Sequence, residues 1–134
     1  MKELTFAQEY RYLDKPDGIT LLTQLSYGGL TITVNAKVDT GATYCLFRRE
    51  HGEELGVPVE QGLLVVLDTL GGPLEAFGHE VIIQTSGLIF TSFVCFAKHP
   101  GLRRNLLGRQ GWLRKLRLAV IDYDNLLYLN TYDS

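Results

Sequence analysis

The 134-residue chain has few of the residues that mark several protein classes. Its only two cysteines, Cys45 and Cys95, lie far apart and form no CxxC or Cys/His ligand pattern, which disfavours a disulfide scaffold and a zinc site. We expect two free, buried thiols in a reducing compartment. The only methionine is Met1, so a methionine-rich binding groove is excluded.

An excess of one charge and a long apolar run are also missing. Thirteen Lys and Arg against 15 Asp and Glu give a formal net charge of −2, which predicts neither a nucleic-acid nor an anionic-membrane partner. The longest uncharged stretch, residues 81–97, is interrupted by polar residues and is shorter than the roughly 20 apolar residues of a membrane helix. Residues 1–5 include charged and polar side chains where a secretory signal needs an apolar run, so we expect a cytoplasmic location.

Short strands dominate what is present. The length is that of one domain, residues 1–134, and residues 30–38 alternate apolar and polar side chains with the period of a half-buried strand. Gly28-Gly29 and Ser86-Gly87 are typical of tight hairpin turns. We therefore predict an all-β domain with strands at 19–26, 30–38, 63–67, 79–84, 88–96, 118–121 and 126–129.

Helical signals are few. Residues 47–55 are rich in helix formers and end at Gly56 and Pro58, which are typical C-terminal stop signals. Residues 109–116 place apolar side chains on one face and predict a second helix of two turns. A basic cluster overlaps this segment, and we interpret it as a solvated helix face: Arg103, Arg104, Arg109, Arg114, Lys115 and Arg117. His51, His79 and His99 share no ligand spacing, so no metal site is predicted.

The tripeptide Asp39-Thr40-Gly41 stands directly after the alternating strand. An acid there, followed by a hydroxyl residue and a glycine, places a carboxylate on a sharply turned loop. Gly41 lets another backbone approach closely, and the hydroxyl of Thr40 can stabilise the turn. From these residues alone, a catalytic carboxylate and an Asx-type turn with a solvated Asp39 are both possible.

Three stretches together resemble the retropepsin-like (retroviral-type) aspartic proteases, most closely the cellular and bacterial members. They are residues 36–42, the glycine-rich segment 67–74, and residues 105–109, which resemble the family's second signature. The resemblance implies a single lobe with closed barrel-like sheets, a flap hairpin and one or two short helices, working as a two-fold dimer.

The resemblance also implies the site residues and the reaction. Asp39 is the catalytic residue, Thr40, Gly41 and Ala42 form the active-site loop, and no metal or cofactor takes part. The flap and substrate-binding residues are Leu70, Gly71, Gly72 and Pro73, and the second signature is Leu106, Leu107, Gly108 and Arg109. Asp39 of each subunit of a homodimer would share one proton with its counterpart and activate the water that cleaves a peptide or protein substrate.

Several alternatives stay open. Asp68-Thr69 is not a second active-site motif, because Leu70 stands where the glycine must be. The flap segment also fits a plain exposed turn; if it is a flap, Leu67, Leu70 and Leu74 would be its apolar walls. Family members often carry an acid where this chain has Thr43 and Tyr44, so Arg109 lacks its usual partner and is interpreted as a structural, hydrogen-bonding residue. The alternative function is a non-catalytic peptide-binding or dimerisation module.

Overall fold

The computed structural model describes residues 1–133. Strands form most of the chain, which confirms the predicted all-β class. In chain order the elements are β1 (Gln8–Arg11), β2 (Thr20–Tyr27), β3 (Leu30–Val38), β4 (Leu46–Phe47), α1 (Arg49–Glu54), η1 (Val59–Gln61), β5 (Leu63–Thr69), β6 (Gly72–Thr85), β7 (Leu88–Ala97), β8 (Asn105–Leu107), η2 (Leu113–Lys115), β9 (Leu116–Ile121), η3 (Asp122–Asp124) and β10 (Leu126–Thr131).

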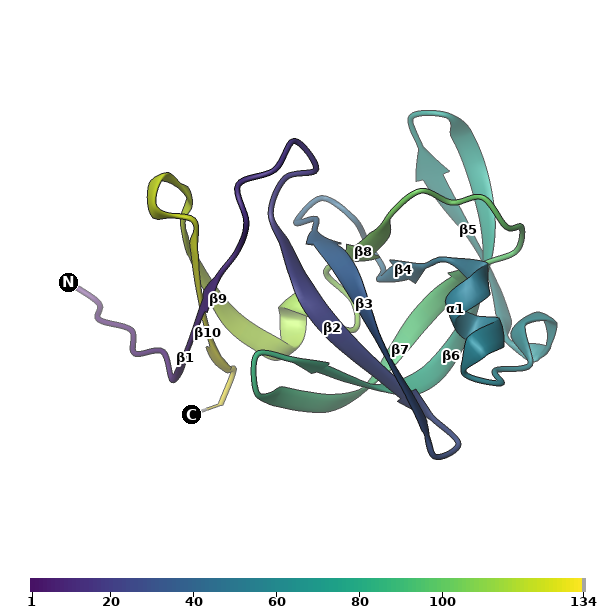
Figure 1. The fold of residues 1–134 in the computed structure, drawn as a ribbon, viewed down its shortest axis with the longest axis horizontal. Helices are drawn as coiled ribbons and strands as arrows, with labels where there is room; N and C mark the ends of the chain where they lie inside the picture. The colour runs from purple at the N-terminus through teal and green to yellow at the C-terminus, as the bar shows by residue number, and fades with distance from the viewer. Residues whose placement is uncertain (134) are drawn as a thin grey trace.

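A closed six-stranded barrel forms the body of the molecule. The sheet runs in the order β2-β3-β8-β4-β7-β6-β5, and an additional pairing of β2 with β6 closes it, leaving β5 as an edge strand. The hairpin of β5 and the first half of β6 projects from the barrel, and a separate sheet of β1, β10 and β9 packs at the opposite end (Figure 1). The expected barrel-like sheets are therefore present.

Two hairpin turns lie where the dipeptides Gly28-Gly29 and Ser86-Gly87 predict them. Gly28 and Gly29 have φ angles of 56° and 85° and join β2 to β3 through the pair Tyr27↔Leu30. Ser86 and Gly87 have φ angles of 44° and 84° and join β6 to β7. Positive φ at both central residues is the geometry that matches the strand twist of a two-residue hairpin.

The first helix is confirmed but shorter than predicted. α1 covers only Arg49–Glu54, and Phe47 belongs to β4 instead. Beyond Leu55, Gly56 adopts a φ of 75°, its N–H donates to Glu53 O, and the Val57 N–H donates to Gly52 O. This pair of bonds is a Schellman ending, so Gly56 is the C-terminal stop that the sequence indicates.

The prediction of a second helix at residues 109–116 is wrong. Only the single turn η2 forms there, because Gly111 takes a φ of 93° and Trp112 leaves the helical region before the turn begins. The apolar pattern that suggested a helix reflects burial: Trp112 is fully buried and its Nε1–H donates to Thr85 Oγ1 at 3.0 Å. Arg109, Arg114 and Lys115 are exposed as expected, but on extended and turn segments rather than a helix.

The core has two parts. The larger fills the barrel and continues under the sheet of β1, β10 and β9, and its fully buried side chains include Phe47, Phe96, Trp112 and Leu127. The smaller lies between β4, β6 and β7 and consists of Leu46, Ala76, Cys95 and Ala97. Partly buried side chains of the β5–β6 hairpin, Val65, Leu67 and Leu74, pack against it. Among residues 1–133, no helix is long and apolar enough to span a membrane.

Candidate active site

Asp39 follows directly on β3, where that strand runs parallel to β8. The register pairs Ala36 with Asn105 and Val38 with Leu107. The apolar positions of β3 point inward, with Val34 and Ala36 buried, while Thr33 and Asn35 on the other face are exposed. The alternation therefore anchors β3 in the barrel and delivers the half-exposed side chain of Asp39 at its end.

The loop after β3 is held by main-chain hydrogen bonds. The Asp39 N–H donates to Leu107 O at 3.0 Å, and the Ala42 N–H donates to Asp39 O at 3.2 Å. The Gly41 N–H donates to Asp39 Oδ1 at 3.0 Å, so one carboxylate oxygen is fixed by its own loop. Asp39 Oδ2 has no hydrogen-bond partner within residues 1–133. The carboxylate is thus oriented and still has one oxygen open to a ligand.

Residues 108–110 clamp the other side of this loop. The Arg109 N–H donates to Ala42 O at 2.9 Å and the Gln110 N–H donates to Thr43 O at 2.8 Å. Gly108 is buried between the two segments, and a Cβ there would lie 2.8 Å from Ala42 O and closer still to the main-chain oxygen of Tyr44. Only glycine fits this position. The structure therefore brings the two sequence signatures into direct contact.

Two thiols lie behind the loop. Cys45 and Cys95 are free and buried, and the Cys95 N–H donates to Cys45 O at 2.9 Å. Cys45 Sγ accepts the Gly108 N–H at 3.4 Å and faces Gln110 O at 3.5 Å. Burial raises the pKa of Cys45 to about 11 and that of Cys95 to about 12. These neutral thiols are packing residues, as the sequence predicts, and Cys45 also stabilises the loop.

A cavity of about 340 Å³ lies between the loop and the β5–β6 hairpin. This volume falls in the range of small-ligand pockets, roughly 300–1,000 Å³. The residues that line it are mostly apolar or hydroxyl-bearing and include Gly41, Ala42, Thr43, Tyr44, Leu46, Val66, Leu67 and Leu106. The sequence patterns indicate only some of these; Thr43, Tyr44, Leu46 and Val66 are recognisable as lining residues only once the fold brings the hairpin beside the loop.

The predicted flap segment forms the tip of that hairpin. Asp68 pairs with Pro73 and Thr69 with Gly72, which leaves Leu70 and Gly71 in the turn. Thr69 Oγ1 donates to Gly72 O at 2.6 Å and accepts the Gly71 N–H at 3.2 Å, so the tip is ordered by its own threonine. Leu67 lines the cavity described above, whereas the Leu70 side chain is fully exposed.

Leu74 and Arg109 lie apart from the cavity. Leu74 lines a second hollow together with residues 99–102. The Arg109 side chain is exposed, and its guanidinium makes no hydrogen bond or ion pair within the described chain. Its contribution to the loop in this protomer is therefore the main-chain bond to Ala42. Residues 1–133 contain no cluster of three or more His, Cys, Asp or Glu side chains suited to a metal ion.

A six-stranded barrel, a carboxylate on a glycine-containing loop and a hairpin that lines a cavity with that loop are the features of one lobe of an aspartic protease. Comparison with family models agrees: the aspartyl protease model matches residues 23–110, and the chain belongs to this family. The matched segment includes the Asp39 loop, the hairpin and the second signature, while β1, β9 and β10 lie outside it.

Solved structures show the same fold. A retropepsin-like aspartic protease from Rickettsia conorii is 20% identical, with a TM-score of 0.62 over 90% of this chain and 97% of that one. EIAV protease, in complex with the inhibitor HBY-793, is 21% identical, with a TM-score of 0.52 over 79% of this chain and 88% of that one. The fold is therefore retropepsin-like, as the sequence resemblance predicts. No curated protein sequence matched the chain in a direct search.

Proposed function

We propose that this protein is a homodimeric aspartic endopeptidase in which Asp39 of each subunit activates the water that attacks a peptide bond. The main support is the environment of Asp39: its main chain is held by β8, its Oδ1 is held by the Gly41 N–H, and its Oδ2 is left for a ligand. A reactive carboxylate needs this combination of fixed orientation and one free oxygen.

The chemistry requires a second carboxylate. Two carboxylates about 3 Å apart cannot both ionise, so they share a proton; the ionised one accepts a proton from water and the protonated one polarises the carbonyl of the substrate. The sequence contains one Asp-Thr-Gly, and Asp68 lies in β5 at the hairpin, followed by Thr69 and Leu70. The second carboxylate is therefore assigned to Asp39 of another copy, related by a two-fold axis.

The cavity between the loop and β5 is the proposed place for a substrate side chain. Its lining of Tyr44, Leu46, Val66, Leu67 and Leu106 suits an apolar group of a peptide. The hairpin tip, residues 70–73, is assigned the role of a flap that covers the bound peptide and excludes water. Thr40, Gly41 and Ala42 shape the loop, and Leu106, Leu107 and Gly108 support it from behind.

The direct test replaces Asp39 by Asn and measures cleavage of a pool of unfolded protein substrates together with sedimentation of the enzyme. We expect the cleavage rate of D39N to be at least about 100-fold lower than that of the wild type, since general acid–base catalysis contributes that factor or more. The variant is expected to remain a dimer. Asp68→Asn is the matched control, because it removes an acid at the edge of the same cavity and is expected to keep cleavage.

Two outcomes contradict the proposal. If the wild-type protein binds peptides without cleaving them, it is the non-catalytic binding module instead. If a monomer cleaves at the same specific activity as concentrated protein, the site is not shared between two chains. The shared proton also predicts a bell-shaped pH profile on the acid side of neutrality; a rate that rises steadily through about pH 9 argues against paired carboxylates.

A further inference from the structure

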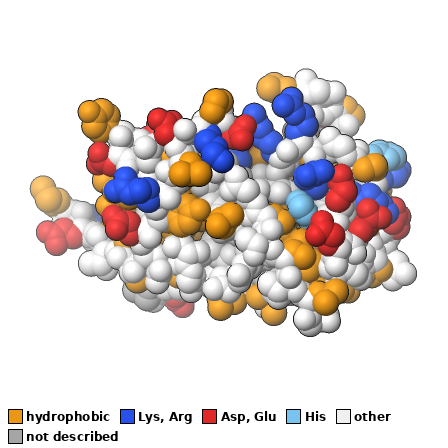
Figure 2. Space-filling view, viewed as in Figure 1, with side chains coloured by type: hydrophobic (Ala, Val, Ile, Leu, Met, Phe, Trp, Pro, Cys, Tyr) orange, Lys and Arg blue, Asp and Glu red, His pale blue; other side chains and the backbone are white. Residues whose placement is uncertain are grey.

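A second cavity, of about 380 Å³, lies on the barrel beside α1 and does not include Asp39. Its walls come from β2, β3, the start of α1 and the segment that leads into β8. Figure 2 shows Lys and Arg side chains gathered on the upper half of this face, although the whole molecule carries a formal net charge of −2. Basic residues from three separated parts of the chain therefore meet at one cavity: Lys37, Arg48, Arg103 and Arg104.

The floor of this cavity is preformed by Asn105, which is 6% exposed. Asn105 Oδ1 accepts the Arg48 N–H at 3.0 Å, and Nδ2 donates to Asn35 O at 3.0 Å. Nδ2 also lies 3.3 Å from His51 Nε2. The side-chain amide of Asn105 is thus hydrogen-bonded within the protein, and it joins α1, β3 and β8 into a rigid base.

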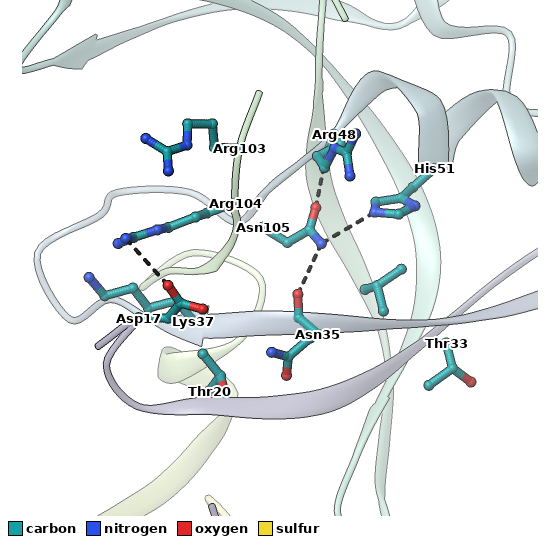
Figure 3. Close-up of a pocket in the computed structure, with 11 residues that line it drawn as sticks. Asp17, Thr20, Thr33, Asn35, Lys37, Arg48, His51, Arg103, Arg104 and Asn105 are labelled. Atoms are coloured by element: carbon teal, nitrogen blue, oxygen red, sulfur yellow. Dashed lines mark hydrogen bonds and ion pairs between the residues drawn. The ribbon is translucent and has the colours of Figure 1, made fainter. Parts of the chain in front are cut away.

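The basic groups stand around that base. In Figure 3, Arg103, Arg104 and Lys37 lie on one side of Asn105, and Arg48 and His51 lie on the other. Arg104 is 3.6 Å from the Asp17 carboxylate, and both side chains are about half exposed. Within residues 1–133, Lys37 and Arg103 have no carboxylate partner. Arg48 Nη2 donates to Glu50 at 2.9 Å, while its buried Nε–H has no hydrogen-bond acceptor in the described chain.

The charge balance indicates the ligand. The four basic side chains contribute +4, and the three carboxylates beside the lining residues, Asp17, Glu50 and Glu54, contribute −3, so the region carries a net charge of +1. A phosphate monoester carries about −1.5 to −2 near pH 7, and guanidinium groups match its oxygens with two parallel N–H donors. We propose that this cavity is a binding site for the phosphate group of a small molecule. The proposal does not rest on the peptidase activity.

The test is isothermal titration calorimetry of the purified protein with inorganic phosphate, and separately with glycerol phosphate, at one fixed, low ionic strength. We expect saturable binding of at least one of the two. Tighter binding of the ester identifies a phosphorylated metabolite as the ligand, and tighter binding of phosphate identifies the free anion. Acetate at the same concentrations is expected to bind at least about tenfold more weakly, because it offers less charge and fewer acceptor oxygens.

Variants locate the binding. Lys37→Gln with Arg103→Gln removes two cations that have no carboxylate partner and is expected to weaken binding about tenfold or more. Lys2→Gln with Arg114→Gln is the matched control, since it removes the same charge from exposed positions elsewhere. If the first pair unfolds, Arg103→Gln alone, at an exposed position, replaces it.

Three results overturn the proposal. The first is no saturable phosphate binding by the wild-type protein, and the second is equal weakening in the control pair, which would indicate general surface charge. The third is binding of a short single-stranded oligonucleotide through Lys37 and Arg103 at an affinity far above that of glycerol phosphate, because that identifies a nucleic acid rather than a small molecule.

Discussion

Replacing Gly108 by alanine tests the contact between the two signature segments. A Cβ at this position lies 2.8 Å from Ala42 O and closer still to Tyr44 O, and neither main-chain atom can move without moving the Asp39 loop. An ordinary contact begins at 3.4 Å, so Ala42 O must move by about 0.6 Å and Tyr44 O by more. Overpacking of this kind costs about 1–3 kcal/mol.

The shift also weakens the two hydrogen bonds that clamp the loop, from Arg109 to Ala42 and from Gln110 to Thr43. Each contributes about 0.5–1.5 kcal/mol. We expect the free energy of unfolding of G108A to fall by roughly 3 kcal/mol. For a domain of this size the melting temperature then falls by about 10 °C.

Urea unfolding followed by the fluorescence of the single tryptophan, Trp112, measures this loss, because its side chain is fully buried in the folded chain. Gly71→Ala is the control: its added Cβ meets only Thr69 Oγ1, at 3.8 Å, and its φ is not positive, so its unfolding midpoint should stay near that of the wild type. Equal unfolding midpoints for G108A and G71A would show that the Asp39 loop accommodates a Cβ at position 108 without loss of stability. That result would refute the argument that this contact excludes every residue except glycine.

The other predictions concern buried groups. Cys45 and Cys95 should resist alkylation at pH 8 until the chain is unfolded in urea. Because burial raises the pKa of these thiols to about 11 and about 12, the folded thiols stay protonated while those of the unfolded chain ionise from about pH 8.5; the free energy of unfolding should therefore fall as pH rises above that value. Trp112→Phe leaves the Thr85 hydroxyl without its donor and should lower the free energy of unfolding, measured by circular dichroism, by about 1–3 kcal/mol. Adding Thr85→Val should restore part of this loss. Asn105→Ala removes three contacts at once and should lower the melting temperature far more than Asn35→Ala, whose side chain is exposed.

The strands and turns were largely predictable because their causes are local. Alternation alone indicates β3 and its inward face, and the pairs Gly28-Gly29 and Ser86-Gly87 indicate both tight turns, which need positive φ. The Asp39 tripeptide is likewise visible as a turned loop after a strand. Such features depend on residues a few positions apart, so one sequence is sufficient to read them.

The errors have a non-local cause. Residues 109–116 have helical spacing, yet Gly108 and Gly111 lie against the backbones of Tyr44 and Phe93, and this close packing determines the path of the chain. The sequence does not predict the short strands β1, β4 and β8, because two to four residues carry too little periodicity. The parallel pairings of β4 with β7 and of β8 with β3, and the pairing of β1 with β10, join segments dozens of residues apart.

The pairing of β3 with β8 connects the two sites. Ala36 pairs with Asn105 at the floor of the cationic cavity, and two residues later Val38 pairs with Leu107, whose oxygen accepts the Asp39 N–H. One short strand pair therefore carries the proposed catalytic carboxylate at its end and the proposed phosphate site on its side. Because the buried Asn105 amide ties β8 to both β3 and α1 and cannot move alone, substitutions at Asn105 should disturb both sites. Substitutions at the rim of the cavity, at Arg103 for example, should affect only anion binding.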